Sequence, residues 1–282
     1  MSPSDGHALS RERRLAYCRC AARYSRPLDW EGNPVFRELP ILELEYARLP
    51  TEPFLWDRVD WGLKKIRERT DCQDFIMIAL FRMLYRYQGS ALLTAEHRAA
   101  ITHALLGAKY WNTEPGPDTC CWTTENHQAM YHVGELLAGQ LWPDERFRND
   151  GRLGRAHREH ARERLYRWLD WRMRLGFSEW NSAHYYDDDI AVLLNLYDYA
   201  EDAALRGQAA RVLDQMFFEL AVIHFRGTLP VTQGRAYDAE VRYPSQTPVS
   251  ILIRLVLLDT PVEELPARLS RSAVVWCGSG YE

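Results

Sequence analysis

The chain has 282 residues, of which 46% are hydrophobic, and a formal net charge of −4 at pH 7. This length is sufficient to bury a sizeable core in one or two domains. The small negative charge gives no reason to expect a nucleic-acid or membrane-surface partner, and no apolar run suits a secretory signal or a membrane span. We therefore expect a cytoplasmic protein.

The cysteines and histidines show no metal-binding pattern. Six cysteines are present, without a CxxC pair or the ligand spacing typical of zinc sites. His157 and His160 fall in a long charged segment, where we expect them on the solvated face of a helix. The sequence therefore predicts neither a metal site nor a cofactor.

The beginning of the chain differs in pattern from the rest. Residues 1–52 are rich in Arg and Pro and predict an irregular arm that wraps a larger body. From residue 53 onward the spacing of apolar residues predicts helices almost throughout, so we expect one helical domain over 53–282. Within it, residues 74–87 are apolar almost all round, which predicts a buried helix, and Thr94 is placed to begin a helix over 95–110.

Further helices are expected over 126–141, 153–175, 187–199, 203–224 and 250–258. Residues 228–247 are punctuated by Gly and Pro and are expected to hold short β-like pieces. Buried helices and longer or more charged ones alternate, at intervals of roughly 50–60 residues, the length of a helical hairpin with functional loops. The pattern predicts an all-α fold, an (α/α) toroid or barrel of helical hairpins with fewer hairpins than a closed ring needs. An irregular bundle or a solenoid is the alternative.

Two polar, aromatic-rich stretches each lead directly into a predicted helix. Their candidate residues are Trp122, Glu125, Asn126 and His127 in the first, and Glu179, Trp180, Asn181, His184, Tyr185 and Tyr186 in the second. Amides, imidazoles, phenols and indoles gathered at helix entrances are what a carbohydrate site needs. As an alternative, the polar residues are helix caps and the aromatic ones are core.

Three motifs in order carry a family resemblance. They are Thr-Glu-Asn-His at 124–127, Glu-Trp-Asn-Ser-x-x-Tyr at 179–185 and Gly-Arg-Ala-Tyr at 234–237. Together, over residues 122–238, they resemble the (α/α)-toroid polysaccharide lyases and their relatives. In such lyases an Asn-His pair and a Tyr, often helped by an Arg, cleave uronic-acid polysaccharides by β-elimination. The resemblance implies a polysaccharide or oligosaccharide as the partner of this chain.

The chemistry of elimination suits the same residues. The proton at C5 lies next to a carboxylate, whose developing negative charge must be stabilised. Asn126 and Arg235 are candidates for holding that carboxylate, and His127 is the candidate base, since imidazole has a pKa near ~6.5. Tyr185 or Tyr237 would protonate the leaving oxygen, and as an alternative a tyrosine serves as base and acid in turn.

Further side chains would support the reaction and hold the sugar. His184 would assist proton transfer. Flat faces for sugar rings are expected from Trp122, Trp180 and Tyr186, and polar contacts to the substrate from Glu125, Glu179 and Asn181.

Two other functions fit the sequence. An inverting glycoside hydrolase on the same fold needs two carboxyl groups roughly 6.5–9.5 Å apart, for which Glu125 or Glu179 with Asp187 or Asp188 are candidates. A carbohydrate-binding helical scaffold without turnover is the second. Asp187 and its neighbours are otherwise expected to favour the N-terminus of their helix electrostatically.

Overall fold

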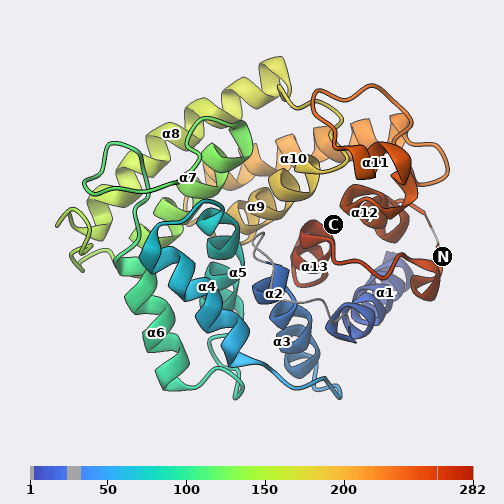
Figure 1. Ribbon diagram of the computed structural model, residues 1–282. Coiled ribbons are helices and arrows are strands. Elements are labelled where there is room, and N and C mark those ends of the chain that lie inside the picture. The colour runs from blue at the N-terminus through green and yellow to red at the C-terminus, as the bar shows by residue number, and fades with distance from the viewer. Residues whose placement is uncertain (1–2, 24–32, 259, 282) are drawn as a thin grey trace.

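The computed structural model describes residues 3–23, 33–258 and 260–281, and every regular element in these ranges is helical (Figure 1). The β-type pairings among them are two isolated bridges, Arg146 with Leu153 and Phe225 with Thr228. The predicted all-α class is confirmed. No helix in the described ranges combines the length and the apolar content that crossing a membrane requires.

A row of buried helices forms the centre of the molecule. Its members are α5 (Gln73–Arg86), α7 (Glu125–Leu141), α9 (Tyr185–Tyr199) and α13 (Arg271–Cys277). Each packs against the next in this order. Nearly all their side chains are buried, polar ones included, as expected for helices that carry apolar residues all round.

Amphipathic helices cover the outside of this row (Figure 1). The covering helices are α4 (Trp56–Glu68) and α6 (Ala95–Leu106) beside α5, α8 (Gly154–Leu175) on α7, and α10 (Ala203–Ile223) on α9. In α8 the buried residues Ala161, Leu165 and Leu169 recur every fourth position, so one face packs and the other is solvated. Helix α8 ends at Gly176, whose φ of 70° suits glycine.

Most of the described part of the first 52 residues is helical, so the expectation of an irregular arm is wrong. It forms α1 (Pro3–Arg23), α2 (Asn33–Phe36) and α3 (Glu38–Tyr46). Pro40 is compatible with a helix because it lies in the first turn, where its missing N–H is not needed. Long-range contacts also stabilise this segment: Arg14 donates hydrogen bonds to the carbonyl oxygens of Trp276 and Ser279. Such long-range contacts cannot be predicted from the local spacing of apolar residues.

The C-terminal quarter departs further from expectation. Residues 228–247 hold no strand; they form a loop followed by α11 (Asp238–Arg242) and the 3₁₀ turn η1 (Pro244–Gln246). The predicted apolar helix is present as α12 (Pro248–Val256), and a second 3₁₀ turn, η2 (Val262–Glu264), follows it. Helix α13 was not predicted, yet it lies in the buried row.

Candidate active site

A cavity of about 430 Å³ lies where the N-terminal ends of α5, α7, α9 and α13 meet. Its wall includes Cys72 just before α5, His127 in the first turn of α7, Tyr185 at the start of α9 and Arg271 at the start of α13. Helix N-termini carry partial positive charge. Four of them, with arginine side chains added, make the cavity suited to an anionic group.

Five of the six predicted catalytic residues line this cavity: His127, His184, Tyr185, Arg235 and Tyr237. They come from the start of α7, the start of α9 and the loop before α11. The first two segments were predicted at helix entrances and the third in a stretch of short β-like pieces, and the wall of the cavity includes residues of all three.

Asn126 is the predicted catalytic residue that does not line the cavity. Its side chain is fully buried, and the Thr124 hydroxyl donates a 2.6 Å hydrogen bond to its amide oxygen. Its amide nitrogen has no hydrogen-bond partner within the described part of the chain. The amide of Asn126 is therefore buried outside the cavity wall, and its NH₂ group donates no hydrogen bond to a described residue.

His127 is held by a carboxylate from the neighbouring helix. Its Nδ1 lies 2.6 Å from Oδ2 of Asp74, which is completely buried in α5, so Nε2 is the ring nitrogen left for the cavity. Burial alone would lower the pKa of His127, but the charge and hydrogen bond of Asp74 outweigh it and raise the pKa to about 9. The pair resembles the base-and-orienting-acid arrangement of nucleophilic enzymes.

Tyr185 and Tyr237 meet through their hydroxyl groups. The Arg235 guanidinium donates a 2.9 Å hydrogen bond to the Tyr237 hydroxyl and lies 4.8 Å from the Tyr185 ring centre. The Nη1 group of Arg235 donates a hydrogen bond to Glu179 Oε1 at 3.1 Å. Burial and the contact with Tyr237 raise the pKa of Tyr185 well above its ordinary value, so this phenol stays protonated.

His184 is paired in the same way as His127. Its Nδ1 lies 2.6 Å from Oε1 of Glu240, and Oε2 of Glu240 accepts from the backbone N–H of Tyr237 at 3.1 Å. Burial opposes a charged imidazole, but the hydrogen bond to Glu240 prevails and raises the pKa of His184. One carboxylate thus positions two of the predicted catalytic residues.

The loop that carries Arg235 and Tyr237 is fastened to the entrance of α9. The Ser182 hydroxyl donates to the Arg235 carbonyl at 3.0 Å, and the N–H of Gly234 donates to the Trp180 carbonyl at 2.8 Å. A Cβ atom on Gly234 would lie 2.5 Å from the Ser178 carbonyl oxygen. Glycine is needed here because the two loops approach backbone to backbone.

The six predicted substrate-binding residues have different surroundings in the structure. Trp180 is 49% exposed, Asn181 beside it takes a left-handed φ of 54°, and Glu179 holds Arg235. None of the six predicted substrate-binding residues lines the cavity. Trp122 stacks on Tyr131 with ring centres 4.1 Å apart.

Glu125 and Tyr186 are engaged in structural contacts. Glu125 pairs with Arg172 and accepts hydrogen bonds from the backbone of residues 178 and 179, at 2.9 and 2.7 Å. It therefore anchors the loop before α9. Tyr186 is buried, with its hydroxyl 3.3 Å from Glu219 of α10, so it serves the core.

Several residues of the site were not singled out from the sequence. Asp74 and Glu240 resemble ordinary acidic residues in the first turn of a helix, and nothing local indicates that each holds a histidine. Arg271 lies in the tail, where no helix was predicted. Asp71 and Cys72 precede a recognised helix, and their closeness to His127 depends on tertiary packing alone.

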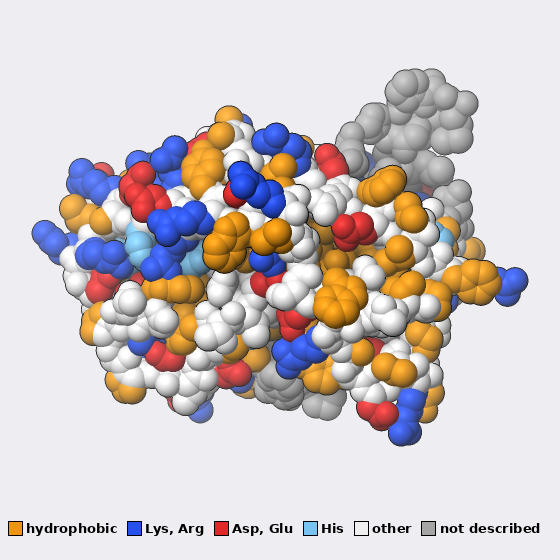
Figure 2. Space-filling model, turned by 90° about the horizontal axis from the view of Figure 1, so that it is seen from above, with side chains coloured by type: hydrophobic (Ala, Val, Ile, Leu, Met, Phe, Trp, Pro, Cys, Tyr) orange, Lys and Arg blue, Asp and Glu red, His pale blue; other side chains and the backbone are white. Residues whose placement is uncertain are grey.

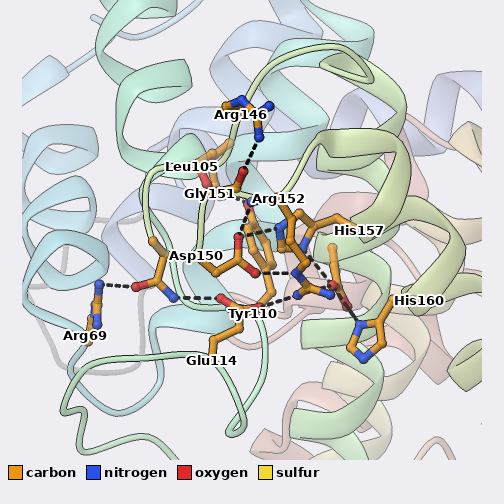
Figure 3. Close-up of polar contacts among 12 residues, drawn as sticks. Arg69, Leu105, Tyr110, Glu114, Arg146, Asp150, Gly151, Arg152, His157 and His160 are labelled. Atoms are coloured by element: carbon orange, nitrogen blue, oxygen red, sulfur yellow. Dashed lines mark hydrogen bonds and ion pairs between the residues drawn. The ribbon is translucent and has the colours of Figure 1, made fainter.

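A second polar cluster lies between α7 and α8 (Figure 3). Glu135 of α7 accepts from Nδ1 of both His157 and His160, at 2.8 and 2.9 Å, and Nε2 of His157 lies 3.2 Å from Asp150. His157 is fully buried and His160 about a quarter exposed. The expected solvated position is therefore wrong for His157, because the helix face that carries it turns towards Glu135.

Arginine completes the charge balance of this cluster. Arg152 forms an ion pair with Asp150 at 2.5 Å, and its guanidinium lies 3.8 Å from Glu114 and 4.0 Å from Glu135 (Figure 3). Carboxylates and cations therefore alternate, and the cluster serves as an ion-pair network that fastens the two helices.

Figure 2 shows the face that includes α8. Lys and Arg side chains gather on the left, over α8, and hydrophobic side chains gather towards α10 and α11. The exposed hydrophobic residues of the described chain include Phe218 and Val222 of α10 and Tyr243 directly after α11. Exposed aromatic rings beside charged groups suit contact with sugar rings.

The chain matches no family model, and neither a curated protein nor a solved structure shows significant similarity to it.

Proposed function

We propose that the chain is a polysaccharide lyase that cleaves a uronic-acid-containing polysaccharide or oligosaccharide by β-elimination. The observation that carries the proposal is the gathering of five predicted catalytic residues around one cavity, although they come from three separate segments. In this proposal the paired inner and outer helices are the hairpins of an (α/α) toroid. Their inner N-terminal ends face the substrate.

The cavity supplies positive charge for the uronate carboxylate. Removing the C5 proton places negative charge on that carboxylate, and fixed cationic groups stabilise such a transition state. Arg235 lines the cavity, and Nε2 of His127 faces it because Asp74 holds the other nitrogen. We assign the carboxylate to these two side chains, with the converging helix N-termini adding to the field.

The tyrosine pair would move the proton. Tyr237, whose hydroxyl receives a hydrogen bond from Arg235, acts as a phenolate and takes the proton from C5. The C5 electron pair forms the C4–C5 double bond, the C4–O bond breaks, and Tyr185 protonates the leaving oxygen. The contact between the two hydroxyls then returns the proton from Tyr237 to Tyr185. This assigns the base to Tyr237 in place of His127.

The hydrolase alternative has weaker support. Its candidate carboxylates are engaged elsewhere: Glu125 with Arg172, Glu179 with Arg235, and Asp188 with Arg271 at 2.6 Å. None of these carboxylates lines the cavity. A carbohydrate-binding protein without turnover is the remaining alternative.

Near-ultraviolet absorbance tests the proposal. The protein is incubated with glucuronan, alginate, pectate and glycosaminoglycans, and a new C4–C5 double bond raises the absorbance. His127→Ala should abolish the rise and leave the circular dichroism spectrum unchanged, whereas His103→Ala, on the exposed face of α6, should retain it.

Each other result identifies a different function. New reducing ends without an absorbance rise would point to hydrolysis and contradict the lyase. Binding of a polyuronate with neither product would indicate a binding protein. Full activity in His127→Ala would remove this residue from the mechanism.

A further inference from the structure

Three metal-ligating side chains lie together on the wall of the cavity. Asp71 and Cys72 come from the turn before α5, and His127 comes from the first turn of α7. One ligand atom from each lies within 4.8 Å of those of the other two. Cys72 and His127 are 55 positions apart in the sequence, so the sequence pattern did not reveal that they lie close together.

Each of the three side chains has an atom available for a ligand. Nδ1 of His127 is held by Asp74, which leaves Nε2. The Cys72 thiol makes no hydrogen bond with any described residue and is buried against the cavity. Oδ1 of Asp71 accepts from the Cys121 N–H at 2.9 Å, which leaves Oδ2.

The donor set selects the class of cation. Thiolate and imidazole are ligands of zinc and similar transition metals, whereas Mg²⁺ and Ca²⁺ prefer oxygen alone. Three protein ligands beside an open cavity match the catalytic type of zinc site, in which the fourth position stays free. Asp74 has the role of the carboxylate that orients a metal-binding imidazole.

We propose that Asp71, Cys72 and His127 bind a divalent cation of the zinc class, with its open coordination position directed into the cavity. The metal would displace the proton of the Cys72 thiol, as thiolate ligation requires. If the proposed lyase function is also correct, the cation bound to Nε2 takes the place of His127 as the positive contact for the uronate carboxylate. The binding of the metal does not depend on that function.

A second group with ligand-like geometry among the described residues is Glu114, Glu135 and His157. Both ring nitrogens of His157 are hydrogen-bonded, and the Arg152 guanidinium lies within 4.0 Å of both glutamates. A cation there would meet this positive charge, so we do not assign it a metal. Because the group contains no thiol, Co²⁺ bound there would give no cobalt–thiolate charge-transfer band.

Cobalt titration tests the proposal. The full chain is reduced, freed of metal and titrated with Co²⁺, and the near-ultraviolet charge-transfer band of a cobalt–thiolate bond is followed. We expect the band in the wild type and in Cys120→Ser, whose thiol lies outside the cavity, and its loss in Cys72→Ser. Asp71→Asn keeps the Oδ1 contact with Cys121 and should weaken binding by at least about tenfold. Asp74→Asn should weaken it by roughly 10–100-fold.

Two results would overturn the metal site. One is the absence of a charge-transfer band in the wild type. The other is a band that persists in Cys72→Ser and disappears in Cys121→Ser, which would assign the thiolate to a different cysteine. Because the titration needs no turnover, a chain that binds Co²⁺ but releases no unsaturated sugar would retain the metal site and lose the lyase proposal.

Discussion

Asp187 of α9 caps the N-terminus of α13, with its Oδ2 2.9 Å from the backbone nitrogen of Arg271. Its Oδ1 also accepts hydrogen bonds from the hydroxyl of Ser270 and the backbone N–H of Ser272, at 2.6 and 3.0 Å. A single buried carboxylate therefore satisfies the donors that begin the last helix of the buried row. Since Arg271 lines the cavity, this contact contributes both to the stability of the fold and to the position of a side chain in the site.

We predict that Asp187→Asn destabilises the protein by about 3 kcal/mol. The amide has one acceptor oxygen, so a donor at the start of α13 loses its partner, and hydrogen bonds to charged groups contribute about 1.5–3 kcal/mol each. Chemical denaturation of wild type and variant gives the difference in the free energy of unfolding. The cap assignment fails if the two curves coincide.

Asp189, two residues further on, is the matched control. It is fully buried, and neither carboxyl oxygen has a hydrogen-bond partner in the described ranges. Burial, with the nearby charge of Asp188, raises the pKa of Asp189 far above its ordinary value, which favours the neutral form of this carboxyl group. Asp189→Asn should therefore change the free energy of unfolding by less than about 1 kcal/mol. A loss as large as that of Asp187→Asn would show that both carboxylates are structural anions.

The contrast between these aspartates shows what the sequence can and cannot reveal. Helices α5 to α10 follow from apolar spacing and from caps such as Thr94, because those signals are local. Helix α13 has only seven residues, too few for a periodic pattern, and its cap comes from Asp187, about 83 positions earlier in the chain. Its place in the buried row depends on tertiary contact.

The candidate site was predictable to a similar extent. Reactive residue types at helix entrances indicated His127 and Tyr185, since helix starts are marked in the sequence, whereas Tyr237 was indicated by the Gly-Arg-Ala-Tyr motif. Asp74 could not be recognised as the partner of His127, because an acid in a first helical turn has a local explanation. Asn126 was indicated by its neighbour His127, whereas the structure turns its side chain into the core.

Removing either hydroxyl of the tyrosine pair should abolish most of the elimination. Tyr185→Phe would remove the acid and Tyr237→Phe the base, and general acid–base groups contribute about 10²–10⁴-fold to a rate. The measurement is kcat on the polyuronate that the absorbance assay identifies. Tyr243→Phe is the control, since this ring is 57% exposed and lies outside the cavity. Equal loss in all three variants would contradict a specific role for the pair.

Arg235→Ala should mainly weaken substrate binding and transition-state charge stabilisation. A charged hydrogen bond contributes about 1.5–3 kcal/mol, so kcat/KM should fall roughly tenfold to a hundredfold. Arg242→Ala, which removes an exposed arginine paired with Asp238 on α11, should change little. Affinities for a uronic-acid oligosaccharide and for a neutral oligosaccharide of the same length are measured as well, and an equal loss of affinity for both would show that Arg235 does not recognise the carboxylate.

The network between α7 and α8 predicts a pH-dependent stability. Burial opposes the charged form of His157, but Glu135 and Asp150 outweigh it and raise the pKa of His157. Hydrogen bonds from His157 and His160 in turn overcome burial and lower the pKa of Glu135. Charged His157 therefore stabilises the fold fully below its unfolded pKa, near ~6.5, and this contribution is lost as pH rises through the raised folded value. The contribution of Glu135 is present above its unfolded pKa, near ~4.3, and is lost as pH falls through the lowered folded value.

His157→Gln should lower the free energy of unfolding by about 3–5 kcal/mol near pH 6, because it leaves Glu135 buried with one partner fewer. The difference from wild type should shrink at alkaline pH, where His157 is neutral in the native protein as well. Urea denaturation at a series of pH values measures this difference, and His103→Gln, on the exposed face of α6, is the control. A difference that stays constant from pH 6 into the alkaline range would show that His157 contributes by packing and not by its charge.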